Sequence, residues 1–564
     1  MIFSNMTYNR PDVKKIEQQF KQLLKSFKES GSFEEQDESL AAINKLRSEV
    51  DTHCSLVHIR HSIDTNDSFY KKEQDYIDEI TPILQGYESD VYKELVQATY
   101  RSDLEEKWGK QLFMLAELSL KTFDEAVIED LQKENKLITE YNQIIASAKI
   151  EFDGEERTLS ELTPFELDKD RNVRKEAANA RYAFMSARED DFDRIYDELV
   201  DVRTTIAHKL GFENFVELGY ARMSRTDYDQ EMVANFRKQV VDYIVPVATR
   251  LRKRQEERIG VESLHYYDEP FSFRTGNAKP KGDAEWIIAN GENMYSELSP
   301  ETKEFYHFMQ ENELMDLLSK KGKQGGGYCA YLSEYKAPFI FANFNGTSGD
   351  IDVLTHEAGH AFQGYESRHF TVPEYNFPTM EAAEIHSMSM EFFTWPWMES
   401  FFKEDVEKYK FDHLSSGLLF IPYGVAVDEF QHFVYENPKA TPEDRKQAWR
   451  SIEKKYLPHR NYENHSYLEN GGFWQRQSHI FQVPFYYIDY TLAQICAFQY
   501  WRVMNEDWDG AWESYLTLCK AGGSQSFTSL VKEADLRSPF SDGTVKVVID
   551  DIEAYLNSVD DKKL

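Results

Sequence analysis

Cysteine is scarce in this chain, which has four cysteines among its 564 residues: Cys54, Cys329, Cys496 and Cys519. They are too few and too widely scattered for a disulfide framework, and no two of them have the short spacing typical of a metal-binding cysteine pair. The sequence therefore argues against a disulfide-stabilised secreted protein. It favours a reducing compartment, which we expect to be the cytoplasm.

Basic residues are also outnumbered. The chain contains 65 Lys and Arg against 99 Asp and Glu, which gives a formal net charge of −34 at pH 7. A field of this sign repels phosphate backbones and anionic lipid headgroups. We therefore expect no nucleic-acid partner and no binding to a membrane surface.

Long apolar runs are missing as well. A membrane-spanning helix needs about 18 or more consecutive apolar residues, whereas the apolar stretch that begins at Leu418 already meets a proline at Pro422. The first 14 residues lack the apolar segment of a secretory signal. Glycine and proline are modest in number, at 26 and 17, and aromatic residues make up 14% of the chain, which excludes disorder as the main state.

The apolar residues near the N-terminus recur at helical spacing. Ile16, Phe20 and Phe27 fall on one face of a helix whose other faces are charged. Residues 68–149 continue in the same style with scarcely any glycine or proline. We therefore predict a helical N-terminal domain over residues 1–190.

Two short segments interrupt the helical pattern. An Asp153-Gly154 pair between alternating residues predicts a tight β-hairpin. Further along, residues 338–346 are aromatic and β-prone, with proline at one end and glycine at the other, so we predict a strand there. We predict a mainly α fold with a small β element, in which residues 191–564 form a second domain.

The strongest chemical signal is the HExxH pattern at residues 356–360, which read HEAGH. On a helix, His356 and His360 lie one above the other and can hold one zinc ion, while Glu357 is angled toward a bound water. Residues 350–355 supply an N-cap and an apolar face for such a helix. Because this composition would give only about 0.07 chance matches, two unrelated surface histidines are the weaker interpretation.

A catalytic zinc usually has three protein ligands. Gln363 and Glu366 stand where a metzincin would have glycine and histidine, so that class is excluded. A helix predicted from Thr379 to Glu391 carries several glutamates along one side, and we favour Glu384 as the third ligand of one zinc ion per chain.

Two more carboxylates could support the site. Glu391 is either a solvated helix charge or a residue that braces a ligand. Asp352 precedes His356 by four positions, so it either accepts the second N–H of that ring or is a plain charge at a helix N-terminus.

Backbone pairing offers a way to bind peptides beside this helix. We expect the strand at 339–344 to have an exposed edge with which an extended peptide could pair, which makes Phe341 and Asn343 candidate substrate-binding residues. Gly326 and Gly327 lie just upstream in a glycine-rich run, which is either a flap close to the ligand or a simple interdomain loop.

A cluster of tyrosines further along offers hydroxyl donors for a negatively charged transition state. Tyr487 and Tyr490 are three residues apart on a predicted helix, so both hydroxyls can face one cavity, and Tyr486 adjoins them. Since the chain has 33 tyrosines, packing is the alternative role for each of them.

Together these motifs resemble the thimet oligopeptidase and oligoendopeptidase F superfamily of zinc peptidases, most closely its bacterial oligoendopeptidase F and Pz-peptidase branch. Glu384 falls 28 positions after His356, where the family's glutamate ligand is expected. The resemblance is carried by residues 325–328, 337–340, 343–344, 356–360, Glu384, Glu391, 478–479 and 484–490.

The resemblance implies a two-lobed helical zincin-type metallopeptidase with a deep central channel that admits short peptides. It also implies that tyrosines at positions 487 and 490 stabilise the oxyanion and that His479 contacts substrate, with Tyr486 beside them. Val483 stands where the thimet branch has a further tyrosine.

We therefore expect a zinc-dependent endopeptidase that cuts internal bonds of oligopeptides, with Glu357 as the general base. One alternative is a carboxypeptidase on a similar scaffold, which would need a cation such as Arg460 or Arg476 to hold a terminal carboxylate. The other is a peptide-binding scaffold with a structural zinc.

Overall fold

Helices build most of the computed structural model, which describes residues 2–159, 161–320 and 322–564. The first third of the chain forms helices and one hairpin. Their bounds are α1 (Val13–Glu29), α2 (Phe33–Ile63), α3 (Ser68–Val96), α4 (Arg101–Trp108), α5 (Lys110–Thr122), α6 (Ile128–Ala146), β1 (Ile150–Phe152), β2 (Glu155–Arg157), α7 (Thr163–Glu166) and α8 (Arg171–Ala187).

The middle of the chain continues with helices and then enters a small sheet. Its elements are α9 (Glu189–Lys209), α10 (Phe215–Arg222), α11 (Gln230–Gln239), α12 (Val245–Ile259), α13 (Ala284–Leu298), α14 (Pro300–Glu311), β3 (Met315–Leu318), β4 (Tyr328–Leu332) and β5 (Ala337–Phe344).

The rest of the chain is helical. Its elements are α15 (Gly349–Glu366), α16 (Met380–Phe393), α17 (Met398–Phe402), α18 (Val406–Glu436), α19 (Pro442–Tyr456), α20 (Ser466–Glu469), α21 (Ser478–Gln482), α22 (Tyr487–Glu506), α23 (Trp508–Ala521), α24 (Phe527–Glu533) and α25 (Thr544–Ser558).

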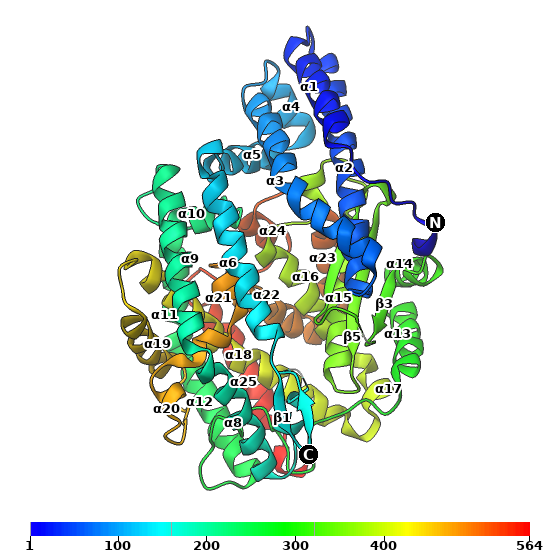
Figure 1. The fold of residues 1–564 in the computed structure, drawn as a ribbon. Coiled ribbons are helices and arrows are strands. Elements are labelled where there is room, and N and C mark those ends of the chain that lie inside the picture. Colours follow the sequence, from blue (N-terminus) through cyan, green and yellow to red (C-terminus); the bar gives the residue numbers. More distant parts are fainter. Residues whose placement is uncertain (1, 160, 321) are drawn as a thin grey trace.

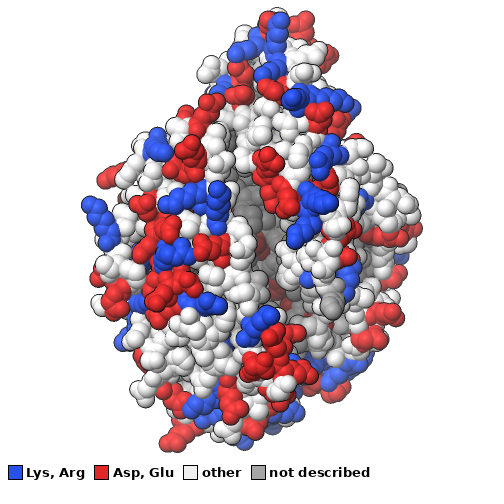
Figure 2. All heavy atoms as spheres, in the orientation of Figure 1, with Lys and Arg blue, Asp and Glu red and all other residues white. Residues whose placement is uncertain are grey.

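These elements form two lobes. In Figure 1, helices α6 and α9–α12 stand on one side, and the sheet with α13–α15 stands on the other. Figure 2 shows that a narrow groove runs between the two sides of this face. The predicted two-lobed, mainly α architecture with a small β element is confirmed. Among the described helices, none is long and apolar enough to cross a membrane.

Local predictions for the N-terminal region hold in detail. Helix α1 begins after Asp12, whose side chain accepts from two backbone N–H groups, and it buries Ile16 and Phe20. Strands β1 and β2 pair antiparallel around Asp153 and Gly154, which both have positive φ. The domain boundary at residue 190 stays a prediction.

The N-terminal helices have a core of their own, and it rests on the link between α15 and α16. Tyr375 in that link is buried in this core, and its hydroxyl accepts from the backbone N–H of Leu112 at 2.9 Å. Next to it, Glu374 forms an ion pair with Arg47 of α2 at 2.7 Å. The N-terminal helices are thereby docked on the segment that positions α16.

Strand β5 lies in the middle of its sheet, in the order β3-β5-β4, parallel to β3 and antiparallel to β4. The strand predicted at 338–346 is thus confirmed, but the predicted exposed edge is wrong, because both edges of β5 are already paired. In the described part of the chain, the two outer strands of this sheet are β3 and β4.

Helices α15 and α16 cross at a glycine. A Cβ added to Gly359 would lie 2.6 Å from Ser387 Cα and 2.7 Å from the His386 carbonyl oxygen. Both are backbone atoms of α16, so the two helices could not approach this closely around a larger residue.

We expect Gly359→Ala to push α16 away from α15, at a cost of about 1–3 kcal/mol in the free energy of unfolding. Chemical denaturation measures this cost. Gly86→Ala is the matched control, because Gly86 lies within helix α3 with nothing within 4 Å of an added Cβ, so it should be neutral or slightly stabilising. Equal stabilities of the two variants would contradict the close-approach argument.

Candidate metal centre and substrate channel

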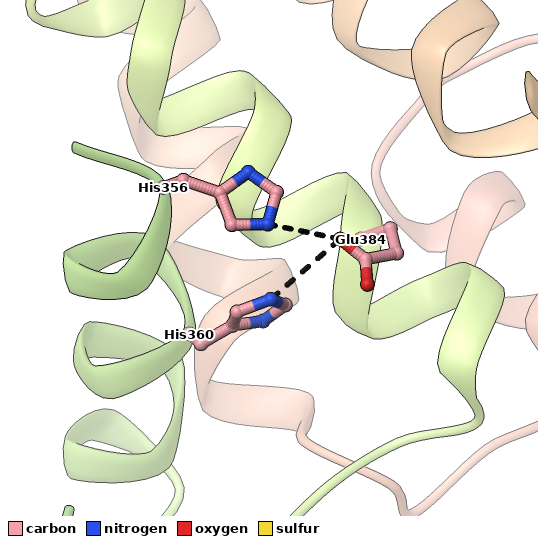
Figure 3. A group of neighbouring side chains, drawn as sticks. All are labelled: His356, His360 and Glu384. Atoms are coloured by element: carbon pink, nitrogen blue, oxygen red, sulfur yellow. Dashed lines mark ion pairs between the residues drawn. The ribbon is translucent and has the colours of Figure 1, made fainter. Parts of the chain in front are cut away.

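Three side chains from two helices converge on one point (Figure 3). His356 and His360 project from successive turns of α15, and Glu384 faces them from α16. Glu384 Oε2 lies 3.3 Å from His356 Nε2 and 3.6 Å from His360 Nε2. Two ligands held about 2.0–2.1 Å from a tetrahedral zinc are about 3.3 Å apart, so this arrangement fits such an ion. Within the described residues it is the one group of this kind.

The charge of Glu384 is stabilised by its neighbours. Burial by itself would raise its pKa, but the His360 and His356 rings outweigh this and hold the pKa well below the ordinary value. Its two oxygens also accept hydrogen bonds, Oε2 from Ser387 at 2.9 Å and Oε1 from Tyr486 at 2.9 Å. Glu384 therefore remains an anion with a fixed orientation.

Glu391 orients the ring of His356. Its Oε1 accepts from His356 Nδ1 at 2.7 Å, and its Oε2 accepts from His413 Nε2 at 2.7 Å. Trp395 donates its indole N–H to the other nitrogen of His413 at 3.1 Å. Because Nδ1 of His356 is engaged by Glu391, Nε2 is the ring nitrogen that faces Glu384 and that would ligate a metal ion.

Of the two roles left open for Asp352, a hydrogen bond to the His356 ring is wrong. Asp352 Oδ1 instead accepts from the hydroxyl of Tyr409 at 2.7 Å, and Glu391 occupies the position at the ring nitrogen.

Glu357 lies beside the three converging side chains and keeps a free oxygen. Its Oε2 is buried and has no hydrogen-bond partner among the described residues. Burial raises its pKa above the ordinary value for a glutamate. A Cβ placed on Gly327 would lie 3.5 Å from Glu357 Oε1, so the glycine-rich run borders this carboxylate.

The predicted tyrosine and histidine cluster forms across from Glu384. The His479 ring centroid lies 4.9 Å from that of Tyr487 and 5.9 Å from that of Tyr490. The Tyr486 ring is tilted against that of Tyr490, with centroids 4.8 Å apart, and its hydroxyl donates to Glu384. Burial raises the pKa of Tyr487 and of Tyr490, so both hydroxyls remain donors at neutral pH.

A channel leads to this cluster. One cavity of about 420 Å³ is lined by His356, Glu391, His479, Tyr487 and Tyr490, among others. Two further cavities, of about 430 and 560 Å³, adjoin it through shared wall residues. Through these shared walls, the three cavities extend away from His356.

Comparison with known proteins places this architecture in a family. The description "Peptidase M3 N-terminal domain" matches residues 3–123, and "Peptidase family M3" matches residues 296–548. A solved structure of PZ peptidase A with an inhibitor is 63% identical, with a TM-score of 0.96 over 99% of this chain and 100% of that chain. The chain belongs to peptidase family M3.

Other relatives agree with this assignment. A structure from Bacillus anthracis str. Ames described as an oligoendopeptidase F is 59% identical, with a TM-score of 0.92 over 100% of this chain and 99% of that one. An oligoendopeptidase F homologue of Borreliella burgdorferi is 24% identical over 410 residues, which cover 69% of this chain and 67% of that protein. The protein is therefore a peptidase with a mainly helical M3 fold.

Two predicted substrate-binding residues of this M3 peptidase have other surroundings. Phe341 has no exposed surface and stacks on Tyr328 with ring centroids 4.8 Å apart, so direct contact with a peptide is wrong for this side chain. Asn343 donates its amide N–H groups to the carbonyls of Gln324 and Gly326, at 2.7 and 2.8 Å. It thereby braces the glycine-rich run.

The glycine-rich run is also tied to helix α2. Gln324 donates its backbone N–H to the carbonyl of Ser62 at 2.8 Å, and the Ser62 hydroxyl donates to its side chain at 3.0 Å. Gly326 and Gly327 themselves are exposed. The run is therefore anchored at Gln324 and exposed at Gly326 and Gly327, where it approaches Glu357.

Sequence reasoning about this peptidase missed the support of the tyrosine cluster. Phe485, just before Tyr486, has a φ of 67°, which is costly for an aromatic residue. The buried Arg225 donates to its carbonyl at 2.5 Å and to Asp489 at 2.7 Å. No sequence pattern links Arg225 to partners some 260 positions away. Nor does any pattern link His413 to the HExxH motif.

We expect Glu391→Gln to weaken zinc binding by this peptidase about 10–100-fold, because the His356 ring loses its anionic acceptor. Competition with a chelator of known affinity measures the change. Asp352→Asn is the matched control, since that carboxylate bonds to Tyr409 rather than to the ring. An unchanged affinity in Glu391→Gln would show that the ring is oriented by other means.

Proposed function

We propose that this peptidase is a zinc-dependent endopeptidase that hydrolyses internal bonds of short, unstructured oligopeptides. The observation that carries the proposal is the convergence of His356, His360 and Glu384 next to the unpartnered carboxylate of Glu357. A nitrogen and oxygen ligand set of this kind suits zinc, and the neighbouring carboxylate suits a proton acceptor.

Each residue has a task in this chemistry. When bound by these ligands, zinc lowers the pKa of water and polarises a carbonyl group. Glu357 accepts the proton of the attacking water and passes it to the leaving amine. Tyr487 and Tyr490, whose hydroxyls stay protonated, donate toward the oxyanion of the transition state. His479 is placed to contact the peptide beside them.

The sheet edge proposed to pair with an extended peptide is that of β4, since β5 is covered on both sides. Gly327 precedes β4 directly and borders Glu357, so a peptide along this edge would pass the metal ligands. The narrow groove between the two lobes supports a preference for short and unfolded chains.

The scaffold alternative with a structural zinc is less well supported. Structural zinc sites usually have four protein ligands, whereas the set among the described residues has three and borders an open cavity. We also propose a cytoplasmic location, which is supported by the four cysteines, all of them free.

Mass spectrometry of products from an acetylated and amidated peptide of about ten residues tests the function. Internal cuts that stop on chelation and resume with zinc are expected. Trimming of the same peptide with free ends, but not of the blocked form, would favour an exopeptidase, and no cleavage of either form by the zinc-loaded protein would favour the scaffold.

In the same assay, Glu357→Gln should keep its zinc but lose about 10²–10⁴-fold in kcat, because the proton acceptor is gone. Glu366→Gln is the matched control, since it makes the same change on the same helix away from the ligand set. Near-normal turnover in a zinc-loaded Glu357→Gln protein would eliminate this residue as the base.

Tyr490→Phe should lower kcat by roughly 10²-fold with little effect on KM, because one oxyanion donor is lost. Tyr500→Phe is the matched control, because Tyr500 lies on the same helix α22 as Tyr490 and its buried hydroxyl bonds to Ser514 of α23. This variant should leave kcat unaltered. If kcat of Tyr490→Phe is normal and only its thermal stability falls, the hydroxyl has a packing role.

A further inference from the structure

The cavity next to the metal cavity has a positive wall. It has a volume of about 560 Å³, and Tyr487 forms part of the wall of both. Among the charged residues that line it are four arginines and two glutamates. An excess of positive charge in this channel contrasts with the net charge of −34 of the whole chain.

Both glutamates of this cavity are already engaged. Glu166 accepts two hydrogen bonds from Arg181, at 2.6 and 2.8 Å. Glu269 accepts two from Arg460, at 3.0 and 2.7 Å, and lies 3.8 Å from Arg252. Paired in this way, the two carboxylates account for three of the four arginines.

Arg476 is the fourth arginine, and no carboxylate of the described residues forms an ion pair with it. Its Nη1 donates to the hydroxyl of Tyr182 at 2.7 Å, and its guanidinium carbon lies 5.2 Å from the ring centroid of Phe473. The side chain is exposed at the cavity wall. A guanidinium held by a hydroxyl and an aromatic ring keeps further N–H donors for a ligand.

Arg476 is also close to the reacting groups along the chain. It precedes His479 by three residues, and Gln477 between them bonds to the ring of His479 at 2.8 Å. The same Gln477 accepts from Tyr423 at 2.8 Å, which fixes this segment against α18. A peptide that passes His479 and Tyr487 therefore enters the cavity where Arg476 lies.

We propose that Arg476 binds a carboxylate of the peptide substrate. This inference rests on the proposed endopeptidase function and adds the chemical class that the channel prefers. The carboxylate has two sources, the C-terminus of a short peptide or an acidic side chain within it. A C-terminal carboxylate held at this point would set the position of the cut relative to the end of the peptide.

The test uses binding to the full-length, zinc-loaded Glu357→Gln protein, so that it does not depend on turnover. The probe is an acetylated fluorescent peptide of about ten residues without Asp or Glu, made as the free acid or as the C-terminal amide. We expect the free acid to bind about tenfold more tightly, as a charge-assisted hydrogen bond allows. Adding Arg476→Gln should bring the two affinities together.

Arg181→Gln in the same background is the matched control. It removes one positive charge from the same cavity, but its guanidinium is committed to Glu166, so the preference for the acid should persist. A third probe, the amide with one internal Gln replaced by Glu, identifies the source of the carboxylate. If this probe binds tightly and the gain depends on Arg476, the site accepts an acidic side chain as well as a C-terminus.

Equal affinities of acid and amide for the protein with Arg476 intact, with no gain from the internal Glu, would overturn the proposal. The proposal would also be overturned if Arg181→Gln lost the preference for the free acid to the same extent as Arg476→Gln. That result would show a general electrostatic effect of the cavity rather than a contact with Arg476. If peptides bind with the Arg476-dependent preference but the protein with Glu357 intact cuts none, the endopeptidase function fails while the carboxylate site stands.

Discussion

The geometry of the site depends on the close backbone contact between α15 and α16 at Gly359. This glycine lies between the two histidines of the motif, and α16 passes directly over it. The crossing brings Glu384 within 3.3 and 3.6 Å of the histidine nitrogens. The N-terminal helices in turn rest on the link between α15 and α16 through Tyr375. Much of the chain thus serves to hold one helix crossing in place.

Buried hydrogen bonds connect this crossing to the rest of the site. Glu391 links His356 to His413, and Tyr486 links Glu384 to the tyrosine cluster. Buried carboxylates are costly unless they are paired and hydrogen-bonded, and both glutamates have partners for each oxygen. The result is a site whose donors and acceptors are oriented before any substrate arrives, which is what electrostatic catalysis requires.

The sequence could predict those features that follow from short spacings. The i and i+4 histidines, the hairpin at Asp153-Gly154 and the paired tyrosines on α22 depend on neighbours within a few residues. It could not predict the order of strands, because β-prone residues look alike at the centre and at the edge of a sheet, and Phe341 was misjudged for that reason. His413 and Arg225 were missed because their partners are set by tertiary packing.

The candidate metal ligands and the tyrosine cluster lie far apart in the sequence, which matters while the chain is being translated. The three candidate metal ligands fall within 28 positions, whereas the tyrosine that completes the hydrogen bonding of Glu384 comes 102 positions after it. Contacts that are local in sequence form faster than distant ones. A growing chain therefore contains its three candidate metal ligands before the tyrosines at 486–490 have been synthesised. On the proposed mechanism, the peptidase therefore stays inactive until the segment that carries these tyrosines has folded.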